Sequence, residues 1–113
     1  MERNRSMEKV FGTTYGMDRT MAFIPELQDY LRKRGFIFTV RKYKMTDAYV
    51  MVKGVGKCHR IPLGEVKSRL DLVPFGWKSG FDTIDDWWDK IRQFIPDTTV
   101  PMYLYSVTKE AQE

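Results

Sequence analysis

A ten-residue stretch that begins at Gly35, with the sequence GFIFTVRKYK, most constrains how this chain can fold. Its apolar and β-branched residues predict a β-strand, in which successive side chains point to opposite faces of a sheet. The face that we expect to pack in the core carries Phe36, Phe38 and Val40. Ile37, Thr39 and Arg41 share the other face. A hydroxyl and a guanidinium lie about 7 Å apart along this face, which makes them a candidate binding site for a polar ligand.

The size and composition of the chain indicate one soluble domain. Its 113 residues are 42% hydrophobic and 30% charged, values that are ordinary for a globular protein with a single core. The sequence contains neither an apolar run long enough to cross a membrane nor the apolar centre of a signal peptide. We therefore expect a cytoplasmic protein without membrane contact, with an N-terminal extension over residues 1–22, a domain over residues 23–109 and a tail over residues 110–113.

Cys58 and His59 are the only cysteine and the only histidine. A single cysteine excludes an internal disulfide, and one thiol with one imidazole is too few for a structural zinc site. Neighbours in a strand face opposite ways, so the two side chains are not expected to form a catalytic pair. No metal and no cofactor are predicted.

The basic residues are concentrated in one part of the sequence. Residues 1–78 contain 16 Lys and Arg against 8 Asp and Glu, whereas residues 79–113 contain 3 against 7. Between residues 32 and 60 a single acid, Asp47, accompanies nine basic residues, namely Arg32, Lys33, Arg34, Arg41, Lys42, Lys44, Lys53, Lys57 and Arg60. A phosphate backbone favours such a distribution. The alternative is a solvated surface on which lysines maintain solubility.

Local signals place a helix before the first strand and two strands after it. Pro25 suits the first turn of a helix, and Gly35 suits its C-terminal end. After a turn at residues 45–47, alternation predicts a strand over residues 48–53, followed by a glycine-containing hairpin turn at residues 54–56. We expect a third strand over residues 57–61, which Pro62 interrupts. Residues 63–72 are expected to continue as strand or as irregular structure.

The C-terminal third predicts a second helix and a final strand. Thr83 is the expected N-cap, and Pro96 ends the helix. The predicted apolar face of this helix contains Ile84, Trp87, Trp88, Ile91, Phe94 and Ile95. The outer face is expected to carry Asp85, Asp86, Asp89, Lys90 and Arg92, and residues 101–108 alternate as a strand. The order of elements indicates an α+β fold, a small and partly open β-barrel with two covering α-helices.

In this order the elements resemble the ASCH family of PUA-like domains over residues 24–108. The resemblance depends on Thr39-Val40-Arg41 after a helix and a glycine, on Ser79-Gly80-Phe81 before a helix with two tryptophans, and on the closing Tyr103-Leu104-Tyr105-Ser106-Val107. It implies a barrel that binds RNA, with Thr39 and Arg41 at the entrance to a cleft. The lysine and glutamate of the family's hydrolases have no counterpart here, because Phe36-Ile37 and Leu72-Val73-Pro74 occupy those places. The acid/base pair of an amidohydrolase is therefore absent.

Three hypotheses about function follow. The first is an RNA-binding or other nucleic-acid-binding module, with contacts from Thr39, Arg41, Lys42, Lys44, Lys53, Lys57, Arg60, Trp77 and Lys78; Tyr43 or Trp77 would offer a stacking face. The second is a small hydrolase acting on a modified nucleoside or RNA, with a site assembled from Thr39, Lys42 or Lys44, and Asp71 or His59. The third is a protein-interaction domain that uses the acidic helix face. The sequence leaves the oligomeric state open.

Overall fold

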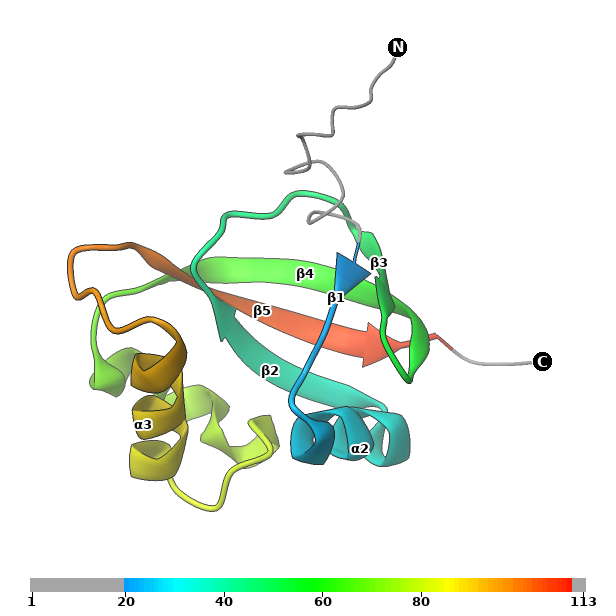
Figure 1. Ribbon diagram of the computed structural model, residues 1–113, viewed down its shortest axis with the longest axis horizontal. Coiled ribbons are helices and arrows are strands. Elements are labelled where there is room, and N and C mark those ends of the chain that lie inside the picture. The colour runs from blue at the N-terminus through cyan, green and yellow to red at the C-terminus, as the bar shows by residue number, and fades with distance from the viewer. Residues whose placement is uncertain (1–19, 111–113) are drawn as a thin grey trace, which may run out of the picture.

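The computed structural model describes residues 20–110, and these residues form a small α+β domain around one curled five-stranded sheet (Figure 1). The strands are β1 (Thr20–Met21), β2 (Phe36–Arg41), β3 (Tyr49–Val52), β4 (Gly56–Val66) and β5 (Met102–Lys109). The helices are α2 (Pro25–Arg34), the 3-10 helix η1 (Arg69–Lys78) and α3 (Ile84–Phe94). The strand order is β1-β3-β4-β5-β2, antiparallel except for the short β1–β3 pair.

Local signals explain the ends of the two α-helices. Pro25 is in the first turn of α2, and Gly35 follows the helix with a φ of 81°, so its amide donates to the carbonyl of Leu31 as a left-handed C-cap does. At α3, Thr83 Oγ1 accepts from the amide of Asp86 at 3.0 Å. Both helices begin and end where the sequence predicts.

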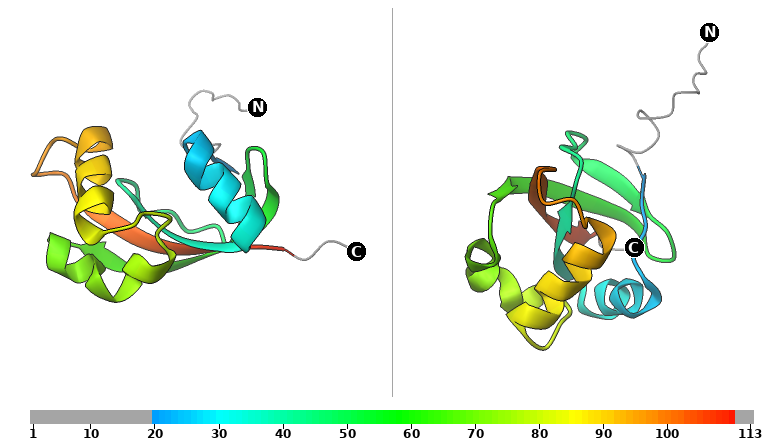
Figure 2. Two further views of the ribbon diagram at one scale, coloured as in Figure 1. Left: turned by 90° about the horizontal axis from the view of Figure 1, so that it is seen from below. Right: turned by 60° about the vertical axis from the view of Figure 1, so that its left-hand side comes forward.

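The two faces of the sheet bury separate hydrophobic clusters, and the alternation in β2 distributes its side chains between them. Ile37 packs with α2 and with Tyr105 and Val107 of β5. The next residue, Phe38, packs in the second cluster with α3 and η1. Figure 2 shows α2 and α3 at opposite ends of the sheet. The predicted alternation of β2 is confirmed, but both of its faces contribute to cores.

Three features differ from the prediction. β4 continues through Pro62, because a register shift between Pro62 and Gly64 against β5 accommodates the missing amide donor. Residues 69–78 form η1, a third helix where the sequence predicts none, and its N-terminus is capped by Asp71. Finally, Thr20 and Met21 pair with β3, so the sheet begins before the predicted domain start at residue 23. The remainder of the predicted extension, residues 1–19, lies outside the described residues.

Candidate functional site

A pocket of about 750 Å³ lies between the chain that joins β1 to α2, the C-terminal end of β2, and helix α3. The curl of the sheet forms it by bringing its two edges together: Arg41 at the end of β2 donates through Nη2 to the carbonyl of Ala22, just after β1, at 2.9 Å. Figure 1 shows the chain between β1 and α2 running across the sheet in that view. The pocket is therefore built from segments that are far apart in sequence.

Thr39 and Arg41 both line this pocket. Thr39 is 7% exposed, and its Oγ1 accepts from Arg41 Nε at 3.3 Å. The guanidinium carbon of Arg41 lies 4.7 Å from the ring centroid of Phe23, a cation–π contact. Thr39 thus positions Arg41, and the side chain of Arg41 is held from three directions.

Arg41 keeps most of its hydrogen-bonding capacity. A guanidinium has five N–H donors, and within the described residues two of them are used, one by Thr39 and one by Ala22. Burial, followed by the charge of Arg60, lowers the pKa of Arg41 to about 10, while Tyr105 acts in the opposite direction. Arg41 is still fully charged at neutral pH, in an environment where a bound anion would be favourable.

The other charged side chains that line the pocket are all lysines. Lys42 follows Arg41, Lys53 lies at the β3–β4 turn, and Lys90 projects from α3. No Asp, Glu, His or Cys is among the described residues that line the pocket. Aromatic rings form much of the wall, contributed by Phe23, Tyr43, Phe81, Trp87 and Phe94. The lining therefore combines four cations with aromatic and aliphatic side chains.

Of the nine predicted site residues, four line the pocket: Thr39, Arg41, Lys42 and Lys53. Lys44 is exposed in the loop after Tyr43, Lys57 lies over the ring of Tyr49 on β3, and Trp77 and Lys78 are at the end of η1. The structure does not bring these four residues to the pocket.

Arg60 is the predicted contact that the structure contradicts. Its side chain is 1% exposed, so it is not available to a phosphate at the surface. Its Nη1 lies 3.3 Å from Met45 Sδ, and its guanidinium is 5.7 Å from the ring centroid of Tyr105. The physical reason is that position 60 alternates to the covered face of β4 together with Cys58, which charge along the sequence does not reveal. Arg60 adds positive charge behind the pocket instead.

Lys90 is a charged pocket residue that the sequence analysis did not identify as a site residue. The helical pattern predicts it on the outer face of α3, but it lines the pocket and is half-buried. The available signal was its spacing: Lys90 stands three residues after Trp87 and four before Phe94, on the border of the apolar face.

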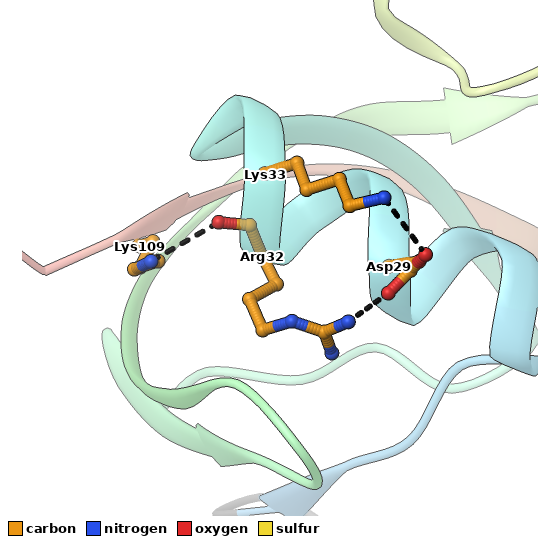
Figure 3. A network of polar contacts seen from close by, with 4 residues as sticks. All are labelled: Asp29, Arg32, Lys33 and Lys109. Carbon is orange, nitrogen blue, oxygen red and sulfur yellow. Dashed lines mark hydrogen bonds and ion pairs between the residues drawn. The ribbon is translucent and has the colours of Figure 1, made fainter.

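Other basic residues of the sequence cluster are used within α2, at the end away from the pocket. Figure 3 shows Arg32 and Lys33 both paired with Asp29, Lys33 Nζ at 3.3 Å, while Lys109 Nζ donates to the carbonyl of Arg32 at 3.1 Å. The groups proposed for a hydrolase are also dispersed. Asp71 caps η1, and His59 stacks on Tyr49 away from the pocket.

A second pocket, of about 540 Å³, lies beside β1 and the β3–β4 turn, and Lys53 is its only charged lining residue within the described chain. Within that same part of the chain, His, Cys, Asp and Glu side chains form no group of three able to hold a metal ion. None of the helices between residues 20 and 110 has the length and apolar content that crossing a bilayer requires.

The fold and the site together define a small α+β domain with a cationic, aromatic-lined pocket at the edges of a curled sheet. Comparison of the chain with protein-family models, with curated proteins and with solved structures finds no match.

Proposed function

We propose that this domain binds RNA or another nucleic acid and takes one nucleotide into the pocket beside Thr39 and Arg41. One observation carries the proposal: four cationic side chains and several aromatic rings line a single pocket that has no carboxylate in its described lining. Nucleotides combine an anionic phosphate with a flat base, and cations with stacking rings are the groups that bind them. We further propose that the domain is PUA-like and related to the ASCH family, on the order of its elements, and that it works in the cytoplasm.

Within this proposal Arg41 contacts the phosphate or a base edge. Its three remaining N–H donors are held in place before the ligand arrives, so little side-chain entropy is lost on binding. Lys42, Lys53 and Lys90 neutralise the phosphates on either side. Tyr43 and Phe94, which are 48% and 64% exposed, offer accessible ring faces at the rim.

The other two hypotheses have less support. A hydrolase needs groups that activate water and transfer a proton, and neither Asp71 nor His59 lines the pocket. The acidic face of α3 is exposed, but Asp85 already pairs with Arg69 at 3.2 Å. Neither arrangement shows a built site comparable with the pocket.

The test compares two triple variants that remove the same charge. The pocket variant is Lys42→Gln, Lys53→Gln and Lys90→Gln. The control is Lys33→Gln, Lys67→Gln and Lys109→Gln, three lysines that do not line the pocket. Binding of a fluorescent unpaired RNA of about 12 nucleotides, within the range of single-strand site sizes, is followed by anisotropy over a salt series.

We expect the pocket variant to lose at least tenfold more affinity than the control. Its salt dependence should also be shallower, by about 0.7 in the log–log slope for each phosphate that the protein no longer neutralises. Equal reductions of affinity in the two variants would mean that only net charge matters, and the pocket would then have no special role. Arg41→Lys adds a charge-preserving check, because it removes the planar fork but keeps the cation.

A further inference from the structure

A row of four side chains, with aromatic rings toward its two ends and Thr108 between them, crosses the face of the sheet opposite Thr39 and Arg41. The register pairs Phe36 with Thr108, Thr108 with His59, and His59 with Tyr49, so these four side chains lie side by side across β2, β5, β4 and β3. Three interstrand spacings make the row about 14 Å long. Figure 1 shows the same order of strands. Thr39 and Arg41 point the other way, since they alternate with Phe36 along β2.

Ring contacts fix the two ends of this row. Tyr49 and His59 stack with centroids 4.9 Å apart and an interplanar angle of 23°. At the other end the ring of Trp77, from η1, stacks with Phe36 at 6.3 Å and 29°. Trp77 is 70% exposed and Tyr49 is 51% exposed, so large aromatic surface is open to solvent at both ends.

One cation lies directly beside the Tyr49 end of the row, and two more lie near α2 close to the chain at Trp77. Lys57 Nζ lies 4.9 Å from the ring centroid of Tyr49. Lys78 follows Trp77 in the chain, and its Nζ lies 5.9 Å from the ring of Tyr30, which the guanidinium of Arg34 also approaches at 5.6 Å. Lys57, Trp77 and Lys78 are three of the predicted nucleic-acid contacts that the pocket does not use.

We infer that this row is a second, separate subsite at which bases of a single-stranded nucleic acid stack. The inference rests on the proposed function for the class of ligand, but it uses none of the pocket residues. Exposed rings stack on any base, and a cation such as Lys57 beside the row suits the phosphates between stacked bases. Four-stranded sheets bind RNA in this way, through rings that stack two or three bases. A duplex keeps its bases paired and stacked, so the row selects unpaired strands.

The test replaces rings while leaving the pocket intact. Tyr49→Ala and Trp77→Ala each remove an exposed ring, so the fold should tolerate both changes, which circular dichroism and thermal melting verify. Each should weaken binding of the unpaired RNA about 5- to 150-fold, the fold-change that corresponds to losing one stacked base. Tyr49→Phe keeps the ring, and Met51→Ala changes a 54% exposed apolar neighbour on the same strand; both should bind as the parent does.

Unchanged RNA affinity in folded Tyr49→Ala and Trp77→Ala proteins would overturn the second subsite, even if the pocket lysine variant loses binding. The reverse pattern, with ring variants weakened and pocket variants unaffected, would support the subsite and refute the pocket. If Met51→Ala weakens self-association in sedimentation while RNA affinity is insensitive to all four changes, the face is a protein contact and the inference is wrong.

Discussion

Replacing Tyr105 by Phe tests how the wall of the pocket is held. Tyr105 is fully buried on β5. Its hydroxyl donates to the carbonyl of Tyr43 at 2.7 Å and accepts from the amide of Met45 at 2.6 Å. Tyr43 and Met45 both line the pocket. One phenol therefore fixes the turn after β2, although the turn and Tyr105 are 60 residues or more apart in the sequence.

The expected loss of stability in Tyr105→Phe follows from the backbone groups that lose their hydrogen-bond partner. Phe fills the space of the ring but removes the hydroxyl, so Met45, which is only 8% exposed, loses the acceptor for its amide. Leaving a buried donor unsatisfied costs about 1 to 3 kcal/mol. For a domain of this size each kcal/mol lowers the Tm by about 4 to 8 °C. We expect a lower midpoint in urea with an unchanged m-value, because the folded state loses a bond without changing its buried surface.

Tyr103→Phe is the matched control. Tyr103 lies two residues earlier on the same face of β5 and is half-buried, and its hydroxyl forms no hydrogen bond within the described residues. Removing its hydroxyl should cost less than about 0.5 kcal/mol, as for changes away from buried networks. If both variants are destabilised equally, the Tyr105 hydroxyl does not hold the turn and the reasoning fails. RNA affinity measured well below the Tm should also fall in Tyr105→Phe alone.

Three further predictions concern the frame around the pocket. Burial raises the pKa of the Cys58 thiol to about 11 from an ordinary 9.0. Thiol reagents at pH 8 should therefore label Cys58 only after denaturation, and rapid labelling of the native protein would contradict this. The free energy of unfolding should fall as the pH rises from about 9 to 11, because the thiol ionises first in the unfolded protein. Gly80→Ala should destabilise the protein more than Gly35→Ala. Gly80 and Gly35 have left-handed φ values of 87° and 81°, so either substitution costs about 1 to 2 kcal/mol in backbone strain. At Gly80 the new Cβ would also lie 2.6 Å from Leu27 Cδ2, whereas at Gly35 no atom lies within 4 Å of it. Thr83→Ala should cost about 1 kcal/mol in urea unfolding through loss of the α3 cap, and Thr83→Ser, which keeps the acceptor, should cost clearly less.

Signals carried by a few adjacent residues predicted structure well. Pro25 and Gly35 bound α2, and Thr83 begins α3, because capping depends on groups within one helical turn. The alternation of β2 correctly separated Phe38 from Thr39. What failed depended on partners distant in sequence. Pro62 stays in β4 because a shift in register against β5 accommodates it, and a single strand carries no sign of that shift.

The site divides in the same way. Thr39 and Arg41 were identifiable because two residues of one strand necessarily share a face. The surroundings of Lys90 and Arg60 could not be predicted, because they depend on how elements distant in sequence pack together. Lys90 lines the pocket because α3 forms one of its walls, and Arg60 is buried because its face of β4 is covered, with Met45 in contact with its guanidinium. The cluster of basic residues in the sequence contains three of the four cations of the pocket. It also contains Arg32 and Lys33, which pair with Asp29 on α2, and sequence alone does not distinguish the two groups.

Variants of Arg41 should change both stability and binding, whereas variants of the pocket lysines should change binding alone, so the lysine variants are the better test of function. Arg41 bonds to Ala22 and so joins the two edges of the sheet; its removal should lower stability and binding together. Lys42 and Lys53 are exposed, and Lys90 contacts only Gln93, at 3.3 Å, among the polar groups of the described residues. Their replacement should leave the free energy of unfolding within about 0.5 kcal/mol of the parent. A fall in RNA affinity in the lysine variants therefore reports on the pocket's charge, whereas a fall in Arg41→Ala also contains the opening of the sheet's edges.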